Sequence, residues 1–308
     1  MKNIVIGIPT YKREILLKKL IRSIFASNLD KDFIDSVDIV VVDNDKLKTA
    51  EITVNELKQE IPNQFTIHYF NNSNKGLSNV RNEILRQAYT FNPDFLVCID
   101  DDEYIVEDWL NELTKTIVNN KADIVVGPVL PKFENETPNY ISKWFKRKKH
   151  SNNEQLFAPI GSGNLILRTA FFKKNNIFFD MRFNSTGAED TFFSLQAIKN
   201  NAKIFFSANA IAYEYFPKSR ANINWLFKRY FRGGNTYTYI LILEKNYLSL
   251  LRKILVNIFS LILGMIILVS VLFPFKNRYY VLLKLIAPSL GSFAAIFNFK
   301  YHEYGQNK

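Results

Sequence analysis

The sequence has few of the residues that build disulfide frameworks and zinc sites. Its 308 residues contain one cysteine, Cys98, so the chain forms no internal disulfide and no cysteine-based zinc site. The three histidines, His68, His150 and His302, lie far apart and lack the close spacing of zinc ligands. A zinc centre is therefore not expected, and metal binding would depend on oxygen ligands.

A signal peptide is also missing from the beginning of the sequence. The apolar stretch within MKNIVIGIPTYKRE, Met1–Glu14, is too short for one and is typical of a first strand. We therefore expect the N-terminal region to stay in the cytosol, where cytosolic metabolites are accessible to it.

Acidic residues are scarce in the last third of the chain. Residues 217–308 contain 13 Lys or Arg and two Asp or Glu, whereas residues 1–216 contain 27 of each kind, so the last third carries the whole net charge of +11. The same segment includes Ile254–Phe275, 22 uncharged residues, which is long enough for a helix to cross a bilayer. A basic tail around an apolar span indicates a membrane with anionic lipid rather than nucleic acid.

The first hundred residues alternate between strand and helix patterns, and 47% apolar content supports a real core. The patterns predict strands at Asn3–Pro9, Val37–Asp43, Phe65–Phe70 and Asp94–Asp100, and helices at Glu14–Ser27, Thr49–Glu60 and Leu77–Ala88. This alternation is typical of an α/β fold with a mostly parallel, Rossmann-like sheet flanked by helices. Ligands bind at the carboxyl ends of such strands. Four polar turns would meet there: Pro9–Tyr11, Asp43–Asp45, Asn71–Gly76 and Asp100–Asp102.

Beyond Asp108 the alternation is less regular. The patterns predict helices at Trp109–Asn119, Asp190–Asn200 and Thr236–Leu251, and strands at Ala122–Pro131, Gly163–Arg168 and Lys203–Tyr215. A second apolar segment, Tyr279–Phe299, is interrupted by Lys284, Pro288 and Gly291. It is either a second membrane crossing or a re-entrant helix.

Three aspartates and a glutamate, Asp100–Glu103, directly follow the fourth predicted strand. Adjacent carboxylates repel, and apolar surroundings make their charge more costly, so such a cluster normally needs a cation. Oxygen ligands favour Mg²⁺ or Mn²⁺, which bind one or two carboxylates and fill their other positions with phosphates and water. The alternative is a solvated acidic turn that caps the helix near Glu107.

Six short segments carry a resemblance to a known family. They are IGIPTYKR (Ile6–Arg13), VVDND (Val41–Asp45), NKGLSNVRN (Asn74–Asn82), CIDDDE (Cys98–Glu103), GSGNLILR (Gly161–Arg168) and GAEDTFF (Gly187–Phe193). In this order and at these intervals they resemble the family 2 glycosyltransferases, whose catalytic domain has the nucleotide-sugar-binding GT-A fold. The resemblance covers about residues 3–235.

The resemblance implies how the donor is bound. Residues expected to contact the nucleotide sugar are Pro9, Thr10, Tyr11, Arg13, Asp43, Lys75, Arg81, Asp100 and Asp101. The D-x-D pattern of the family falls on Asp100 and Asp102, which would hold Mn²⁺ or Mg²⁺, with Asp102 as the direct ligand and Asp100 closer to the ribose. The alternatives are that Asp43 is a helix cap and that Arg81 is only a salt-bridge partner on its helix.

The reaction also needs a base, because an acceptor hydroxyl that attacks an anomeric carbon must lose its proton. The ED pair of the family matches Glu189 and Asp190, which makes Asp190 the expected base, with Glu189 orienting the acceptor. Such a single displacement inverts the anomeric centre. The alternative role for Asp190 is a helix N-cap.

Four further residues are expected to contact the acceptor or phosphate groups. Gly163 would allow close backbone approach, beside Asn164 as a donor or acceptor, although a plain β-turn is the alternative. Arg229 and Arg232 lie three apart on one helical face and resemble a basic element of membrane-linked family members. A QxxRW motif is missing, which disfavours a processive synthase.

We expect a nucleotide-sugar-binding half (residues 1–107), an acceptor-binding and catalytic half of the same domain (108–235) and membrane-associated helices (236–308). The resemblance implies transfer from a UDP- or dTDP-sugar to a glycan or lipid-linked acceptor in cell-surface polysaccharide or lipopolysaccharide synthesis. The enzyme would lie at the cytoplasmic membrane with its catalytic domain on the cytosolic face. Two alternatives stay open, a sugar nucleotidyltransferase and a membrane-tethered nucleotide-binding scaffold without turnover. Sugar identity and oligomeric state stay open as well.

Overall fold

The computed structural model describes residues 1–134, 142, 145, 149–269 and 278–303. The chain divides into two compact units. The first comprises Met1–Lys132, Lys148–Asn184 and Glu189–Tyr215, and the second comprises Phe133–Arg147, Ser185–Ala188 and Phe216–Lys308. The division of residues 1–235 at residue 107 stays a prediction.

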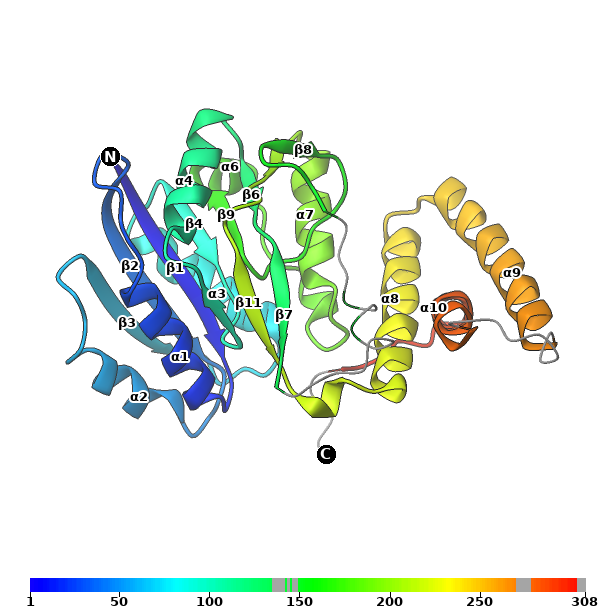
Figure 1. Cartoon of the computed structure of the whole chain (residues 1–308). Coiled ribbons are helices and arrows are strands. Elements are labelled where there is room, and N and C mark those ends of the chain that lie inside the picture. Colours follow the sequence, from blue (N-terminus) through cyan, green and yellow to red (C-terminus); the bar gives the residue numbers. More distant parts are fainter. Residues whose placement is uncertain (135–141, 143–144, 146–148, 270–277, 304–308) are drawn as a thin grey trace. The chain divides into compact units, whose positions relative to one another are not determined.

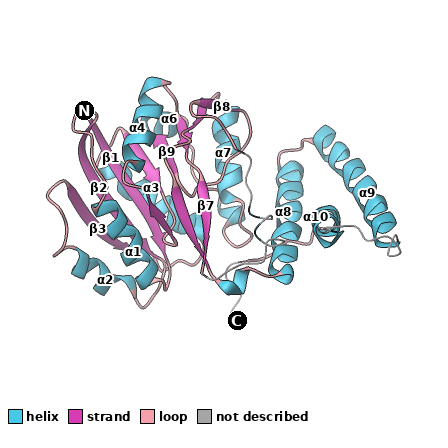
Figure 2. Ribbon diagram, in the orientation of Figure 1, coloured by secondary structure: helices cyan, strands magenta, loops and turns pink. Residues whose placement is uncertain are grey.

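An eight-stranded sheet forms the centre of the first unit (Figure 1; Figure 2). Its order is β3-β2-β1-β4-β9-β6-β10-β8. The strands are β1 (Lys2–Thr10), β2 (Ile34–Asp43), β3 (Phe65–Asn71), β4 (Phe95–Cys98), β6 (Ile124–Val126), β8 (Glu154–Leu156), β9 (Leu165–Arg168) and β10 (Ile204–Phe206). Strands β1 to β4 are parallel, whereas β9 is antiparallel to both its neighbours and β8 is antiparallel to β10. The predicted mostly parallel sheet is confirmed.

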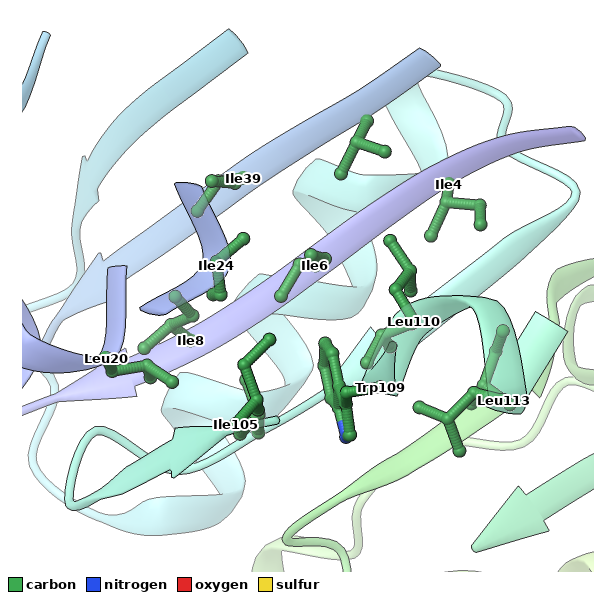
Figure 3. Close-up of a cluster of buried hydrophobic side chains, with 14 of the residues drawn as sticks. Ile4, Ile6, Ile8, Leu20, Ile24, Ile39, Ile105, Trp109, Leu110 and Leu113 are labelled. Carbon is green, nitrogen blue, oxygen red and sulfur yellow. The ribbon is translucent and has the colours of Figure 1, made fainter. Parts of the chain in front are cut away.

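Helices cover both faces of this sheet. They are α1 (Glu14–Phe25), α2 (Ala50–Leu57), α3 (Leu77–Thr90), α4 (Trp109–Asn119), α6 (Thr169–Lys174) and α7 (Glu189–Lys199), with a short 3-10 helix, η2, at Met181–Phe183. Side chains alternate along β1, so Ile4, Ile6 and Ile8 pack in the core with α1, α2 and α4, while Val5 packs in the core with α3 and α7. Figure 3 shows the first of these cores, in which Trp109 is fully buried.

Two strands that were each predicted to be continuous are divided between two sheets, so their predicted bounds are wrong. Ala122–Pro131 forms β6 and β7 (Val129–Phe133), and Lys203–Tyr215 forms β10 and β11 (Ala212–Phe216). Strands β7 and β11 join β5 (Glu103–Ile105) in a three-stranded sheet of order β5-β11-β7. The first break falls at Gly127, where an added Cβ would overlap the carbonyl of Ala210, so two chain segments cross closely as they leave the large sheet.

The second unit contains the helices α8 (Ile223–Leu243), α9 (Tyr247–Val269) and α10 (Arg278–Ile296), after the 3-10 helix η3 (Lys218–Arg220). The predicted helix Thr236–Leu251 is wrong in its bounds. The side chain of Asn222 accepts a hydrogen bond from Trp225 N and begins α8, and Lys245 with φ 52° lies in the turn after it.

The predicted membrane span overlaps α9, although its residues 270–275 lie outside the described part of the chain. Within the described residues, one stretch, Tyr247–Leu268, is long and apolar enough to cross a membrane by length and composition. The predicted second apolar segment corresponds to α10, in which Pro288 lies inside the helix.

Candidate active site

The carboxyl ends of the parallel strands bring the predicted polar turns to one edge of the sheet. Thr10 at the end of β1 pairs with Asp43 at the end of β2, and Asp43 pairs with Asn71 at the end of β3. On the other side of β1, strand β4 ends at Cys98, two residues before Asp100. The predicted gathering of these turns is therefore confirmed.

Two residues of the first loop hold Asp101. Thr10 Oγ1 donates a hydrogen bond to one carboxylate oxygen of Asp101 at 2.9 Å, and Arg13 Nη1 donates to the other at 2.9 Å. The same guanidinium nitrogen also lies 2.9 Å from Oδ2 of Asp102. One positive charge thus compensates two of the three consecutive aspartates.

Burial changes the proton affinity of this cluster. Desolvation raises the pKa of Asp101 from 3.8 to about 6, with the Arg13 charge acting against the increase and the Asp102 charge adding to it. Burial also acts to lower the pKa of Arg13, but the charges of Asp101 and Asp102 outweigh it and the pKa is raised. The cluster therefore strongly favours a nearby cation.

Arg81 of α3 connects the aspartate cluster to the predicted base pair. Its side chain is only 5% exposed; Nη2 donates to Oδ1 of Asp100 at 2.9 Å, and Nε lies 3.4 Å from Oε1 of Glu189. Its buried Nη1 has no hydrogen-bond partner among the described residues. Arg81 therefore forms ion pairs with carboxylates outside its own helix, and its contact with the donor stays a prediction.

Glu189 lies in a strongly desolvated position. Its burial raises its pKa, the neighbouring charge of Asp190 adds to this effect, and the charge of Arg81 opposes it. The pKa of Arg81 is itself raised, because the charges of Asp100 and Glu189 outweigh the lowering effect of burial. Removing Arg81 would therefore leave a buried carboxylate without its cation.

Asp190 stands next to Glu189 in the first turn of α7 and is more accessible, being half-buried. Its Oδ1 accepts hydrogen bonds from the backbone N and the Oγ1 of Thr191, at 2.6 and 3.2 Å. A Cβ built on Gly161 would lie 3.3 Å from the other oxygen, Oδ2. The start of the helix therefore orients the carboxylate, and the loop at Gly161 runs beside it.

This loop also approaches the aspartate cluster. A Cβ built on Gly163 would lie 2.7 Å from Oε1 of Glu103 and 3.3 Å from Oδ2 of Asp100, so glycine allows the close approach. Between the two glycines, Ser162 is buried, and its Oγ has no hydrogen-bond partner in the described part of the chain. Glu103 was predicted only as part of the acidic cluster, and Ser162 was not among the predicted site residues, although both lie inside motif segments.

The structure corrects the prediction for Asn164, which is fully buried. Its Oδ1 accepts a hydrogen bond from Trp109 Nε1 at 2.7 Å, and its Nδ2 donates to the carbonyls of Pro128 and Ala210 at 2.9 and 2.8 Å. Its φ of 58° is one that asparagine adopts more readily than most residues. Asn164 therefore fastens the crossing between the two sheets, and its amide is engaged by the protein itself.

Asp43 likewise has internal partners. It is fully buried, and its carboxylate accepts hydrogen bonds from Asp45 N, Ala50 N and Tyr69 Oη at 2.9, 3.0 and 3.0 Å. The carboxylate thus closes the loop between β2 and α2. A contact with the base or ribose of a donor stays a prediction and would require this loop to rearrange.

The remaining predicted donor contacts differ in accessibility. Tyr11 is 44% exposed, and the Lys12 ammonium lies 5.3 Å from its ring centroid. Lys75 is exposed as well, whereas Pro9 is buried. Tyr11 and Lys75 are therefore the accessible members of this group.

Arg229 and Arg232 belong to the second unit, where both have partners. The Arg229 guanidinium lies 5.1 Å from the Trp225 ring centroid, and Arg232 forms an ion pair with Glu303. Their predicted contacts with a diphosphate or with lipid head groups stay predictions.

The donor set of the aspartate cluster fits a hard divalent cation. The described residues contain no group of three or more His, Cys, Asp or Glu side chains that would hold a metal ion alone. Mg²⁺ and Mn²⁺ need only one or two protein carboxylates when phosphate and water complete the shell. Arg13 already places positive charge beside Asp101 and Asp102.

Comparison with known proteins gives matches over most of the chain. A family model described as glycosyl transferase family 2 matches residues 5–173, and one described as glycosyl transferase family group 2 matches residues 95–297. The succinoglycan biosynthesis protein ExoM of Rhizobium meliloti (strain 1021) is 31% identical over 240 residues, which cover 76% of this chain and 74% of ExoM.

Solved structures share the fold. TarS 1-349 from S. aureus, in complex with UDP-GlcNAc, aligns with a TM-score of 0.54 and 22% identity over 74% of this chain and 65% of that chain. The mannosyltransferase PcManGT from Pyrobaculum calidifontis, in complex with GDP-Man and Mn²⁺, aligns with a TM-score of 0.65 and 12% identity over 96% of this chain and 88% of that chain. The expected α/β GT-A fold is thereby confirmed.

Proposed function

Because this chain belongs to glycosyl transferase family 2, we propose that it transfers a sugar from a UDP- or dTDP-sugar to a glycan or lipid-linked acceptor. Family membership makes the protein a glycosyltransferase and decides against the nucleotidyltransferase and the scaffold. The proposed products are cell-surface polysaccharides or lipopolysaccharides, which agrees with the succinoglycan role named for the relative ExoM.

One observation carries the proposal: a single buried guanidinium contacts both predicted catalytic clusters. Arg81 pairs with Asp100, which lies in the predicted donor site, and with Glu189, which precedes the predicted base. In a single displacement, the leaving group and the attacking hydroxyl lie on opposite sides of one anomeric carbon, so their protein partners must be close together. The Arg81 contacts meet this requirement.

In the proposed reaction, Asp190 removes the proton from the acceptor hydroxyl as its oxygen forms a bond to the anomeric carbon. The bond from this carbon to the donor diphosphate breaks, and the electron pair leaves with the nucleoside diphosphate. Attack from the opposite face inverts the anomeric centre. The half-buried Asp190 is accessible to an acceptor. The buried Glu189, held by Arg81, would orient this acceptor.

Asp102 and Asp100 would hold Mn²⁺ or Mg²⁺. Such an ion, when bound, stabilises the negative charge of the departing diphosphate. The presence of Mn²⁺ in PcManGT, which shares the fold, supports this assignment. Arg13 would add positive charge beside the same carboxylates.

The donor nucleotide would lie at the edge of the sheet formed by the ends of β1, β2 and β3. Exposed Tyr11 and Lys75 would contact the nucleotide directly. The buried residues Pro9, Thr10 and Asp43 would support this edge of the sheet from inside the protein. Asp101 would act through its bonds to Thr10 and Arg13.

The second unit would attach the enzyme to the cytoplasmic membrane, with the first unit on the cytosolic face. Large apolar side chains are exposed on α9, namely Leu248, Leu251, Leu255, Val256, Ile258, Phe259, Ile262, Met265, Ile266 and Leu268. Among the side chains of α9 that the structure describes, only the side with Asn257 and Gly264 is buried, where Ser289 and Ile286 of α10 lie. Lipid is the medium that favours such a surface, and the basic residues of this unit favour anionic head groups.

A transfer assay on full-length protein in detergent tests this function. We expect turnover with UDP- or dTDP-sugars rather than GDP-sugars, only in the presence of Mn²⁺ or Mg²⁺, and with candidate lipid-linked acceptors supplied. Asp102→Ala and Asp190→Asn should abolish it, whereas Asp35→Asn, an exposed aspartate near the start of β2, should not. Full activity of Asp190→Asn would contradict the assignment of the base.

A further inference from the structure

The loop before Glu189 groups with the C-terminal unit. Ser185–Ala188 belongs to that unit, although the next residue, Glu189, begins α7 of the first unit. Gly187 and Ala188 both have positive φ, at 74° and 68°. For alanine this conformation is unfavourable, so its surroundings must impose it.

The C-terminal tail holds this loop from the other end of the sequence. Glu303 N donates a hydrogen bond to the carbonyl of Ser185 at 2.9 Å, and Ser185 Oγ lies 2.8 Å from Nδ1 of His302. Glu303 is also ion-paired with Arg232 of α8. A backbone bond and a side-chain bond therefore fix Ser185 to two adjacent tail residues.

The tail is in turn fixed to α8 by Asn235, which is buried. Its Nδ2 donates to the carbonyls of Gly291 and Phe299 at 3.0 and 2.8 Å, and its Oδ1 accepts from Tyr301 N at 3.0 Å. A buried amide with all these bonds made holds its neighbours in one arrangement. The tail thus forms a defined connection from α8 and α10 to Ser185.

We propose that His302 is a positioning residue of the transfer reaction. The hydrogen bond between His302 and Ser185 holds the loop Ser185–Ala188 in place. Glu189 and Asp190 directly follow this loop in the chain. Release of Ser185 would let the unfavourable backbone at Ala188 relax and displace the two carboxylates. This inference rests on the proposed roles of Glu189 and Asp190, and it gives the C-terminal unit a part in catalysis besides membrane attachment.

The kinetic test uses full-length His302→Ala and Ser185→Ala in the transfer assay. We expect each to lower kcat about threefold to tenfold, the range of one net hydrogen bond, with an unchanged KM for the donor. The double variant should be no slower than the single ones, because all remove the same bond, and His302→Asn should recover part of the rate. Lys300→Ala is the matched control, since this tail residue contacts Tyr239 instead.

Hydrogen exchange of the amides of residues 185–190, measured without donor, gives a readout independent of turnover. Exchange should be faster in His302→Ala than in the wild type and Lys300→Ala. An unchanged kcat in His302→Ala of an active enzyme would overturn the proposal. If the wild type shows no transfer with any donor, the proposed function fails by itself, and unchanged exchange in His302→Ala would then refute the tail's hold on the loop as well.

Discussion

Two arginines of α3 show how burial decides what a charged side chain contributes to folding stability. Arg81 is 5% exposed and pairs with Asp100 and with Glu189, which is 4% exposed. Arg86 is 57% exposed and pairs with Glu83 on the same helix. Water screens the charges of the Arg86–Glu83 pair. Buried Arg81, by contrast, depends on Asp100 and Glu189 to compensate its charge.

We therefore expect Arg81→Met to lower the free energy of unfolding by about 3 to 5 kcal/mol, because Glu189 would remain buried without a cation. Arg86→Met is the matched control and should lower it by less than about 1 kcal/mol. Urea unfolding followed by tryptophan fluorescence measures both values. If both variants lost the same small amount of unfolding free energy, the role of burial would be contradicted.

Asp101 should make the stability of the metal-free protein depend on pH. Because burial raises its pKa from 3.8 to about 6, folding favours the protonated carboxyl group. The contribution of the protonated Asp101 to the free energy of unfolding is complete below pH 3.8 and is lost as the pH rises through about 6. With a chelator present, the wild type should therefore lose stability relative to Asp101→Asn across this window, measured by urea unfolding at several pH values. Parallel curves for the two proteins would exclude the effect.

At the scale of elements, α8 and α10 approach each other backbone to backbone. A Cβ on Gly234 would overlap the backbone of Pro288, and one on Gly291 would overlap the carbonyl of Phe231. Ser292 Oγ also donates a hydrogen bond to the carbonyl of Gly234 at 3.2 Å. Small residues permit this kind of close helix packing, which is common in membranes.

Neighbouring glycines of α8 provide a direct test of this packing. Gly234→Ala should lower the stability of the helical unit by about 1 to 3 kcal/mol, because a backbone carbonyl cannot move aside easily. Gly233→Ala should instead raise it by up to about 1 kcal/mol, since nothing lies within 4 Å of an added Cβ and alanine favours helix. Thermal unfolding in detergent distinguishes the variants; a stabilising Gly234→Ala would disprove the close contact.

At the scale of the whole molecule, the two units differ in their exposed surface. Exposed apolar side chains of the first unit, such as Ile52 at 72%, are scattered along its sequence, which is ordinary for a protein surface. On α9 they follow one another along the helix, with Phe259 at 67% and Ile266 at 60%. Only the second pattern is a continuous apolar surface, of the kind that marks a protein or membrane interaction site.

Membrane fractionation tests this difference. A lysine at the centre of a spanning helix costs about 2.5 to 3.5 kcal/mol, so Phe259→Lys should shift much of the protein out of the membrane fraction or into aggregates. Ile52→Lys adds the same charge to an equally exposed apolar position of α2 and should leave the distribution unchanged. Membrane retention of Phe259→Lys equal to that of the wild type would argue against insertion of α9.

The alternating core of the first unit could be predicted from the sequence. Strands β1 to β4 and helices α1 to α4 agree with their predicted positions to within a few residues, because periods of 2 and 3.6 are local properties. The motif segments likewise indicated the family and the candidate residues Asp100, Asp102, Glu189 and Asp190.

Contacts between distant segments could not be predicted from the sequence and are seen in the folded chain. Arg81 contacts both Asp100 and Glu189, Asn164 is buried at the crossing of two sheets, and His302 holds Ser185. The division of two predicted strands between sheets belongs here too. Each of these features depends on packing between segments far apart in the chain, and a periodic pattern carries information only about near neighbours.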